Sequence, residues 1–560
     1  MKCDVCIIGS GAGAAPVAYE LSRAGFDVIV LEKGPNLSEE DFSKDEIAIS
    51  RRSIYTPKLW EEQHVIETYA ADGTIRRTTG AESEWSFWNG SMVGGSSNLM
   101  SGFFHRMKPM DFKLLSTFGA VEGANIVDWP ITYDEMEPWY DYVEKVVGVS
   151  GRVIPHRFAE PRSSKDFPFA PTWEQPLSQW IDTACKGLGY ESIPTPRAIL
   201  PHNALHRRGC SYSNFCGSYG CATGAKSHAK AALLNQALNT GKCRIIADAF
   251  VYYLKHDALH VTQAHYYDNA AKSHTISAHI FVVAAQAIET SRLLLNSKSR
   301  FFPNGLANNS NNLGKNLIFS GGGAGQGRLE TSKLLANQRK ELFVRGAFVN
   351  RSLQQWYAFE SEGKRYKGGT IDFLYQHANP IPRAMGAIYD NQGNVQWGAA
   401  LDRALKHAFL ESRIVTFEVF NDWLPTDKNF VSVDEDVKDK WGVPVGALRL
   451  YGHDHDLFVG NYLAQKGEAV LKALGCEEVE STISSAPPPN LVAGGCRFGN
   501  DPKTSVLNKN CRAHELENLY VSDASFMPTG GSVPYTWSIY ANAFRVAQAI
   551  MLHLQKDFSR

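Results

Sequence analysis

A glycine-rich turn near the start of the chain has the spacing of a dinucleotide-binding site. Residues 4–8 (DVCII) form a short apolar run typical of a buried strand, and residues 15–25 (APVAYELSRAG) have a helical pattern. The first glycine of the intervening turn permits a tight bend, the second lets the backbone approach a pyrophosphate, and a small last residue lets the helix pack closely. A pyrophosphate would then sit at the helix N-terminus. The residues expected to hold it are Gly9, Ser10, Gly11, Gly13 and Ala14.

An acidic residue ends the next apolar run. Residues 26–32 (FDVIVLE) follow the helix, and Glu32 stands about 20 residues beyond the glycines, where a carboxylate can accept hydrogen bonds from ribose hydroxyls. This acid disfavours a 2′-phosphate and therefore NADP, but it leaves FAD and NAD open. We assign its neighbour Lys33 to the same site.

Three cysteines form a second group that could do chemistry. Of the ten cysteines, Cys210, Cys216 and Cys221 are spaced as C-x5-C-x4-C in a loop rich in glycine and aromatic residues. Thiolates are the usual ligands of iron–sulfur clusters, and three of them suit a three-iron (3Fe-4S) cluster, which is the interpretation we favour. Structural thiols, with or without one disulfide, are an alternative. Zinc is another, with His206 or His228 as a fourth ligand, although the spacing fits the paired cysteines of structural zinc poorly.

Composition limits the function classes. With 57 Lys and Arg against 58 Asp and Glu, the chain has no bulk charge that would attract nucleic acid or an anionic membrane. No apolar stretch approaches the roughly 20 residues needed to span a bilayer, and we expect no secretory signal at the start of the chain. A chain of 560 residues, 44% of them hydrophobic, is expected to bury a large core in more than one domain.

A third group of residues carries a family resemblance. Residues 85–106 (WSFWNGSMVGGSSNLMSGFFHR) place a glycine–serine cluster inside an aromatic-rich stretch. With this segment the chain resembles the glucose-methanol-choline (GMC) oxidoreductases, in which a GGSS-type segment passes along the flavin. Residues 280–295 (IFVVAAQAIETSRLLL) and the stretch 494–550 resemble two further segments of that family. The resemblance therefore covers the whole chain and implies FAD as the cofactor.

The resemblance also implies which residues hold FAD beyond the glycine turn. They are Gly94, Gly95, Ser96, Ser97, Asn98, Val251, Ala285, Asp523 and Ala524. In some members of the family the flavin is attached covalently through a histidine of the GGSS segment, and the matching position here is Asn98. We therefore expect non-covalent FAD.

An α/β fold in two interleaved parts follows from the same resemblance. A Rossmann-like FAD-binding domain would be assembled from separate pieces of the chain, and an antiparallel sheet backed by helices would form the substrate domain. β-rich tracts such as residues 368–380 (GGTIDFLYQHANP) support the second domain. The FAD-binding domain is predicted at residues 1–45, 80–120, 205–320 and 488–560, and the substrate domain at 46–79, 121–204 and 321–487.

The catalytic base is where the family pattern breaks. Oxidation of an alcohol by hydride transfer to flavin needs a base for the hydroxyl proton. The family's histidine slot falls at Leu491, and its second slot, a histidine or asparagine, falls at Pro534. Neither residue can accept a proton. The candidates for catalysis are therefore nearby residues and a histidine of the expected substrate sheet, namely Asn490, Tyr535 and His377, with His453 and His455 less favoured.

The favoured function is an FAD-dependent dehydrogenase, rather than an oxidase, that oxidises an alcohol group of a sugar, sugar acid or other alcohol. Within the family the chain resembles large subunits of the gluconate 2-dehydrogenase type. That resemblance implies electron transfer through a 3Fe-4S cluster to a cytochrome c-type partner, and a small partner subunit that carries the export signal. It also implies a position at the periplasmic face of the inner membrane; without such partners we expect the cytoplasm.

Two alternatives stay open. The missing base fits a flavoenzyme that performs non-alcohol chemistry, such as desaturation, isomerisation or double-bond reduction. The other alternative is an electron-transfer or scaffold subunit that binds a cofactor but catalyses no reaction. Substrate identity does not follow from the sequence, because fold does not determine function.

Overall fold

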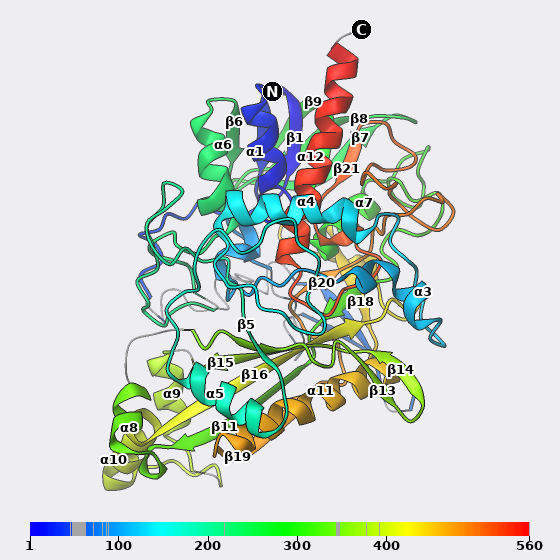
Figure 1. Cartoon of the computed structure of the whole chain (residues 1–560). Helices are drawn as coiled ribbons and strands as arrows, with labels where there is room; N and C mark the ends of the chain where they lie inside the picture. Colours follow the sequence, from blue (N-terminus) through cyan, green and yellow to red (C-terminus); the bar gives the residue numbers. More distant parts are fainter. Residues whose placement is uncertain are drawn as a thin grey trace.

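The computed structural model describes residues 1–44, 46, 63–70, 72–80, 82–83, 85, 87, 89–217, 219–342, 348–376, 378–390 and 392–558, with side chains as far as residue 556. Its described part has two main bodies, the upper one built on a seven-stranded sheet and the lower one on an eight-stranded sheet (Figure 1). The mixed α/β architecture predicted from the sequence, with a Rossmann-like part and an antiparallel part, is confirmed. The exact domain boundaries stay a prediction.

Parallel strands form the first part of the seven-stranded sheet. In spatial order these are β6 (Cys243–Ile246), β2 (Val28–Leu31), β1 (Lys2–Ile8) and β9 (Ser273–Val283), and β21 (Leu519–Val521) also pairs with β9 in parallel. All four residues of β2 are buried, as are most of β1, because helices cover both faces of a parallel sheet. Beyond β9 the sheet continues antiparallel through β8 (Val261–Tyr267) and β7 (Phe250–His256).

Helices packed on this sheet come from both ends of the chain. The helix α1 (Ala15–Arg23) lies beside α12 (Thr536–Phe558), with the rings of Tyr19 and Phe544 6.3 Å apart (Figure 1). The helix α4 (Tyr133–Val143) crosses α12, where the Tyr140 ring meets Trp537 edge to face and its hydroxyl lies 2.7 Å from Ser538 Oγ. Two further helices, α6 (Asn235–Asn239) and α7 (Ala287–Asn296), complete this body.

The eight-stranded sheet is largely antiparallel. Its main order is β19 (Glu477–Ile483), β11 (Gly323–Glu330), β16 (Ser412–Trp423), β15 (Gly369–Tyr375), β12 (Arg351–Leu353) and β5 (Ser192–Pro194), and β10 (Ile318–Ser320) and β20 (Val492–Ala493) join it through β16. The strand β16 is central because it pairs with β11 on one side and β15 on the other.

Two helices cover one face of this sheet. The helices α11 (Asp454–Ala473) and α5 (Leu177–Gly187) lie across it, and their apolar side chains share one core with Val415, Phe417 and Val419 of β16 (Figure 1). A Cβ on Gly467 of α11 would lie 2.7 Å from the Phe417 ring, so glycine lets helix and strand approach closely. Because side chains alternate along a strand, the residues between these three point to the other face.

Smaller elements connect the two bodies. A four-stranded sheet has the order β17 (Phe430–Lys438), β18 (Pro444–Leu450), β3 (Val65–Tyr69) and β4 (Ile75–Thr79). The remaining elements are the hairpin β13 (Ala358–Ser361) and β14 (Lys364–Lys367), the helices α3 (Leu114–Phe118), α8 (Ala336–Leu342), α9 (Pro380–Gly386) and α10 (Gly398–Lys406), and the short turns η1 (Gly95–Leu99), η2 (Pro109–Lys113), η3 (Glu144–Gly148), η4 (Lys230–Leu234), η5 (Thr331–Lys333), η6 (His407–Glu411) and η7 (Ala524–Phe526).

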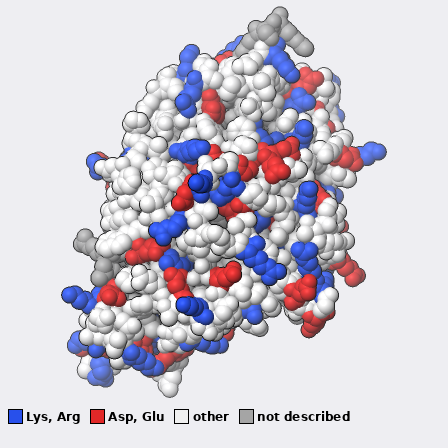
Figure 2. All heavy atoms as spheres, in the orientation of Figure 1, with Lys and Arg blue, Asp and Glu red and all other residues white. Residues whose placement is uncertain are grey.

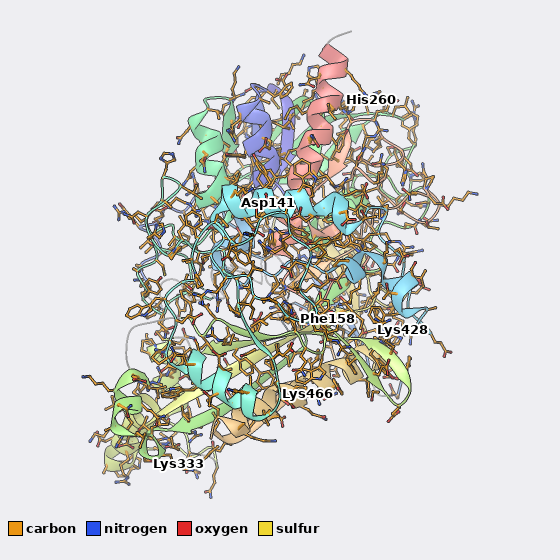
Figure 3. The ribbon with its side chains drawn as sticks, in the orientation of Figure 1. Asp141, Phe158, His260, Lys333, Lys428 and Lys466 are labelled. Atoms are coloured by element: carbon orange, nitrogen blue, oxygen red, sulfur yellow. The ribbon has the colours of Figure 1, made fainter. Side chains whose placement is uncertain are left out.

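The surface carries charge of both signs. Figure 2 shows lysine and arginine interspersed with aspartate and glutamate over the visible face, in keeping with the nearly equal counts. Figure 3 shows Asp141 on α4 of the upper body, and Lys466 on α11 and Lys333 near the tip of the lower body. Among the described residues, no helix is long and apolar enough to cross a membrane.

Candidate functional site

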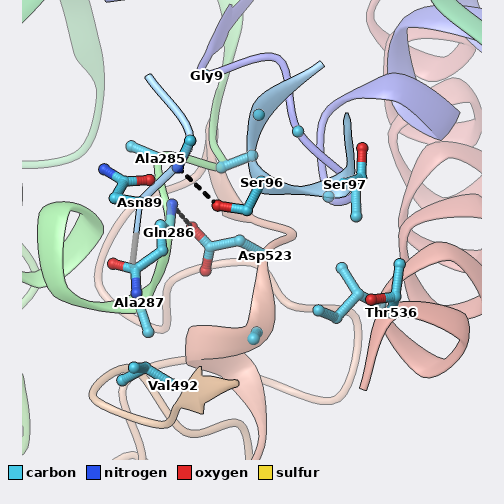
Figure 4. A pocket seen from close by; sticks show the side chains of 18 of the residues that line it. Gly9, Asn89, Ser96, Ser97, Ala285, Gln286, Ala287, Val492, Asp523 and Thr536 are labelled. Carbon is cyan, nitrogen blue, oxygen red and sulfur yellow. Dashed lines mark hydrogen bonds between the residues drawn. The ribbon is translucent and has the colours of Figure 1, made fainter. Parts of the chain in front are cut away.

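A cavity of about 400 Å³ lies between the two main bodies (Figure 4). Its lining starts at Ile8 and Leu31, the last residues of β1 and β2. It includes residues from the segment 89–103, from the start of α7 and from the C-terminal segments, and it reaches Glu418 and Phe420 on β16. In open α/β sheets, ligands bind outside the carboxyl ends of parallel strands, which is where this cavity begins.

The glycine turn forms one wall of the cavity. Gly9 has a φ of +94°, and a Cβ on Gly13 would lie 2.6 Å from the carbonyl oxygen of Ser522, so backbone geometry and packing require both glycines. A Cβ on Gly11 would meet only the Cα of Gly95 at 3.9 Å, because Gly11 faces open space. These three glycines and Ser10 line the cavity, whereas Ala14 is wholly buried in the core beneath it.

Glu32 is fixed at the end of β2. Ser10 Oγ donates to Glu32 Oε2 at 2.5 Å, and the backbone N–H of Gly34 donates to Oε1 at 2.9 Å. Burial raises the pKa of Glu32, and these hydrogen bonds oppose that rise. Ser10 Oγ also accepts from the Gly94 N–H at 2.9 Å, which ties the turn to the GGSS segment. Lys33 joins Glu32 in the cavity lining.

The GGSS segment folds into the tight turn η1 beside the glycine turn. Gly95, Ser96 and Ser97 line the cavity, and Ser96 Oγ accepts from the Gly90 N–H at 2.8 Å. Gly94 and Asn98 lie behind the lining. The Asn98 amide donates to the carbonyl oxygens of Val93 and Gly95 at 3.1 and 2.9 Å, and the side chain is buried.

The third wall comes from the start of α7 and the closing signature. Gln286 has a φ of +82° and its N–H donates to Asp523 Oδ2 at 3.1 Å, an atom that also accepts from Thr290 Oγ1 (Figure 4). Burial raises the pKa of Asp523, and hydrogen bonds from Ser525 and Thr290 oppose the rise. The other predicted residues of this wall, Val251, Ala285 and Ala524, line the cavity as well.

Two of the three predicted catalytic residues line the cavity. Asn490 and Tyr535 both do so, next to Leu491 and Pro534. Tyr535 is 1% exposed, and burial raises its pKa well above the ordinary value, so the phenol stays protonated at neutral pH. His377 lies outside the described residues, and its role stays a prediction.

Two lining residues that the sequence analysis missed come from the central strand of the second sheet. Glu418 and Phe420 line the cavity, and the Phe420 ring meets Phe103 edge to face with centroids 6.4 Å apart. The available signal was the alternation in residues 414–420 (IVTFEVF), which puts Glu418 on the face opposite Phe417 and Val419. Nothing in the family resemblance pointed to that strand.

Comparison with known families settles the affiliation. Residues 10–319 match the N-terminal part of the GMC oxidoreductases, and residues 425–543 match the C-terminal part. This chain belongs to the GMC oxidoreductase family. The predicted resemblance is thereby confirmed, and so is the class of enzyme, an FAD oxidoreductase.

Relatives align along nearly the whole length of this GMC oxidoreductase. A 2-methyl-1,2-propanediol dehydrogenase from Mycolicibacterium austroafricanum is 29% identical over 98% of this chain and 95% of its own. A 6'''-hydroxyparomomycin C oxidase from Streptomyces lividus is 28% identical over 99% and 92%. The fructose dehydrogenase large subunit of Gluconobacter japonicus is 26% identical over 99% of each chain. Since both dehydrogenases and oxidases are among them, the relatives leave the electron acceptor open.

A solved structure agrees in fold. Formate oxidase superposes with a TM-score of 0.62 at 14% identity, covering 99% of both chains. The likeness covers both bodies of the GMC oxidoreductase, and at this identity it concerns the fold alone.

The cavity fits FAD, which members of this family bind. The N-terminus of α1 begins just behind Gly11 and has no side-chain cap, so its dipole favours a pyrophosphate there, although the Ala14 and Ala15 N–H groups donate to the carbonyl oxygen of Gly11. The Glu32 carboxylate at the end of β2 has lone pairs for ribose hydroxyls beyond the two hydrogen bonds described above. Gly11, Glu32 and Ser96 are therefore three of the residues that would hold the cofactor.

The cysteine loop lies directly behind the GGSS segment. Lys226 is buried, and its Nζ donates to the carbonyl oxygens of Asn98, Cys216 and Tyr219 at 3.1, 2.9 and 2.8 Å. One side chain thus ties the loop to the wall of the cavity. Its three partners among the described residues are neutral carbonyls.

The three thiols share a small cavity of about 30 Å³ with Lys226 and Phe348. All are free and partly buried, so no disulfide joins them in this structure. Burial would raise the pKa of Cys221, but the charge of Lys226 and hydrogen bonds from Thr223 outweigh it and lower that pKa. In the described part of the chain, no three His, Cys, Asp or Glu side chains are arranged as a metal site, and neither His206 nor His228 lines this cavity.

Proposed function

We propose that this chain is an FAD-dependent dehydrogenase that oxidises an alcohol group of a sugar, a sugar acid or another small alcohol. The observation that carries the proposal is a single cavity that joins the dinucleotide turn at Gly11 to the substrate sheet at Glu418 and Phe420. FAD, when bound, supplies the acceptor for the hydride of the alcohol carbon. The names of the relatives, which include a diol dehydrogenase and a fructose dehydrogenase subunit, support a small polar substrate.

The residues of the cavity bind and orient in this proposal. The turn at Gly11 and the N-terminus of α1 hold the pyrophosphate, and Glu32 holds the ribose. Phe103 and Phe420 would exclude water from the substrate end, and Asn490, which lines the same cavity, would orient a hydroxyl. We propose that FAD is held without a covalent bond, because Asn98 is buried behind the lining and carries no nucleophile.

The experiment is an anaerobic screen of the purified protein for loss of visible flavin absorbance. Primary alcohols, diols, sugars and sugar acids form one arm. In the other arm, alkenes and enones are added to protein already reduced with dithionite, and the return of flavin absorbance is followed. Bleaching by an alcohol supports the proposal. Return of the absorbance in the second arm, with no bleaching by an alcohol in the first, would support the alternative, a GMC flavoenzyme for desaturation, isomerisation or double-bond reduction, which the aliphatic residues Leu491 and Pro534 favour. Reduction by dithionite but by no substrate would support a non-catalytic electron-transfer subunit.

We also propose that Cys210, Cys216 and Cys221 bind a 3Fe-4S cluster. Buried Lys226 favours a negatively charged group in its surroundings, and three thiolates would supply that charge. Burial raises the pKa of Cys210 and Cys216, so those two thiols would lose their protons on binding iron. The free thiols would have to converge to do so, since they do not form a closed site by themselves. Iron and acid-labile sulfide analysis of anaerobically purified protein, with electron paramagnetic resonance of the oxidised state, tests this. About three irons per chain support the cluster, and their absence makes the cysteines structural.

The proposed cluster also suggests which partners this protein has and where it is located. When bound it would carry electrons from the flavin towards the surface, as a dehydrogenase with a cytochrome c-type acceptor requires and an oxidase does not. The name of the fructose dehydrogenase relative, a large subunit, supports a small partner subunit. We therefore propose a complex at the periplasmic face of the inner membrane. Co-purification from the native membrane fraction tests it, and a chain that is recovered alone and reduces dioxygen directly would refute it.

A further inference from the structure

The active-site cavity needs a proton acceptor that the family's two slots do not provide. Leu491 and Pro534 occupy those slots, and both line the cavity. An alcohol cannot lose its carbon-bound hydride efficiently unless its hydroxyl proton is also removed. The inference below rests on the proposed alcohol oxidation and concerns the residue that takes this proton.

In the part of the chain that the structure describes, six titratable residues line the cavity. They are Glu32, Lys33, Glu289, Glu418, Asp523 and Tyr535. His105 lies nearby in the second sheet's polar network, but neither it nor another described histidine is part of the lining.

Most of these six come from the elements of the dinucleotide end. Ser10 and the Gly34 N–H hold Glu32 there. Glu289 lies 2.7 Å from His64 and 3.3 Å from Arg292; burial would raise its pKa, but the charges of Arg292 and Lys33 and the hydrogen bond with His64 together outweigh burial and lower it.

Asp523 and Tyr535 are no better suited to accept the proton. Ser525 and Thr290 hold Asp523 beneath the glycine turn. Tyr535 keeps its own proton, since its pKa is raised well above the ordinary value. Among the lining carboxylates, Glu418 comes from the substrate sheet, and the other three come from the FAD-binding part.

The position of Glu418 is fixed by the strand that carries it. Its neighbours Phe417 and Val419 are wholly buried in the core under α11, so the Glu418 side chain must project from the opposite face. Phe420, two residues on, projects from the same face and lines the cavity as well. The central place of β16 in the sheet makes this direction rigid.

Charged neighbours surround Glu418 on the adjacent elements. Asp372 of β15 stands directly opposite it in the antiparallel register, and His105 Nε2 lies 3.0 Å from Asp372 Oδ1. Ser352 Oγ of β12 also donates to Asp372. Burial lowers the pKa of Arg197 to about 10, and the nearby Cys216, Asp372 and Glu418 oppose that fall.

This arrangement keeps two adjacent carboxylates in place. His105 and Ser352 hold Asp372 within the sheet, while Glu418 reaches the cavity. Arg197 is anchored through Asn350 at 2.8 Å and over the Phe103 ring at 4.1 Å. A cation anchored in this way limits the repulsion between the two carboxylates without occupying the cavity.

We propose that the Glu418 carboxylate accepts the hydroxyl proton of the substrate alcohol. The O–H bond breaks and its proton goes to Glu418 Oε. The carbon-bound hydrogen leaves with both electrons of its bond to the flavin acceptor, and the electron pair of the broken O–H bond forms the C=O double bond. The carboxyl proton then returns to solvent before the next turnover. Glu418 thereby replaces the base missing at Leu491.

The test uses the purified holoprotein and the variant Glu418→Gln, which keeps the side-chain shape but cannot take a proton. We expect unchanged FAD content and Tm, and a roughly 10²- to 10⁴-fold slower reduction of the flavin by the best alcohol of the screen, mostly in kcat rather than KM. Glu418→Asp keeps a carboxylate and should lose less. Glu480→Gln removes an exposed carboxylate from β19 of the same sheet and serves as the matched control.

A second readout needs no turnover. In the wild-type holoprotein without substrate, titration of a carboxylate beside the flavin should change the visible spectrum of bound FAD with pH, and Glu418→Gln should abolish that change. In turnover, kcat/KM of the wild type should fall at low pH as Glu418 becomes protonated. The pH profile of the Glu418→Gln variant should lack this decrease. Asp372, His105 and Arg197 remain in the variant, so the lost titration belongs to Glu418.

The outcomes separate the two proposals. An alcohol that bleaches wild-type flavin and bleaches Glu418→Gln at a similar rate overturns the assignment of Glu418 and leaves the alcohol oxidation intact. If no alcohol bleaches the wild type, the proposed function fails and this inference fails with it. If Glu418→Gln does not retain FAD, the rates of flavin reduction in Glu418→Asp and Glu480→Gln are compared instead. Equal rates in these two variants would overturn the assignment of Glu418.

Discussion

Replacing Gly11 by alanine should weaken FAD binding without unfolding the chain. A Cβ at this position would find no atom nearer than the Cα of Gly95 at 3.9 Å, and the backbone here lies outside the left-handed region. The added methyl therefore fits the protein but occupies the space where a pyrophosphate approaches the turn. Overpacking of this kind costs about 1–3 kcal/mol, which corresponds to roughly 5- to 150-fold weaker FAD binding.

The control is the neighbouring glycine of the same turn. A Cβ on Gly13 would lie 2.6 Å from the carbonyl oxygen of Ser522 and 2.7 Å from two backbone atoms of Asp523, none of which can move aside cheaply. Gly13→Ala should therefore lower the Tm of the apoprotein by a few degrees, whereas Gly11→Ala should leave it unchanged.

Flavin fluorescence titration of the two apoproteins, together with their thermal unfolding, measures both quantities. Wild-type affinity in Gly11→Ala would refute the placement of the pyrophosphate at Gly11. If Gly11→Ala lowers the Tm as much as Gly13→Ala does, its weaker FAD binding would come from damage to the fold. The result would then not support a pyrophosphate at this turn.

Three further predictions concern buried charges. Ser10→Ala removes the short hydrogen bond to buried Glu32 and should cost about 1–3 kcal/mol, visible as a lower Tm than that of Ser10→Thr. Glu160 lies 2.5 Å from Lys108; burial would raise its pKa, but the charge of Lys108, its hydrogen bond and the charge of Arg162 together outweigh burial and lower it to about 2, from an ordinary value of 4.5. A carboxyl group with a lowered pKa stabilises the fold at pH values above its ordinary pKa, and this stabilisation is lost as the pH falls to the lowered pKa. The free energy of unfolding of Glu160→Gln should therefore be lower than that of wild type at pH 7 by up to roughly 3 kcal/mol. In urea unfolding, this difference should shrink between pH 4.5 and 2. Lys226→Met removes the buried cation of the cysteine loop and should lower the iron content per chain in anaerobic preparations, whereas an unchanged iron content would show that the loop holds its ligands without that charge.

The sequence could predict the dinucleotide end of the site because that end depends on local backbone rules. A glycine that needs a φ of +94° and an acid at the end of the next strand are readable from residue type and spacing alone. Gly9, Gly11 and Glu32 line the cavity as expected. Ala14 does not, because its contribution is close packing of α1 beneath the turn.

The substrate end could not be predicted in the same way. Glu418 lies in a tract whose alternation is clear, but the face that meets the cavity depends on where α11 packs, and one sequence does not fix that contact. The family pattern directed attention to Leu491 and Pro534, where proton chemistry is absent. Asn98 shows the converse, since a residue inside a recognised motif lies behind the lining and bonds to backbone carbonyls.

The alternation of β16 has a consequence for how this enzyme can diversify. Odd-numbered residues such as Phe417 and Val419 carry the core, and even-numbered residues such as Glu418 and Phe420 meet the cavity. Apart from Glu418, whose carboxylate the proposed reaction needs, residues on the even face can therefore change the shape of the cavity while the hydrophobic packing of the sheet stays intact. Natural selection can explore alcohol specificity on this strand largely independently of the pressure to remain folded.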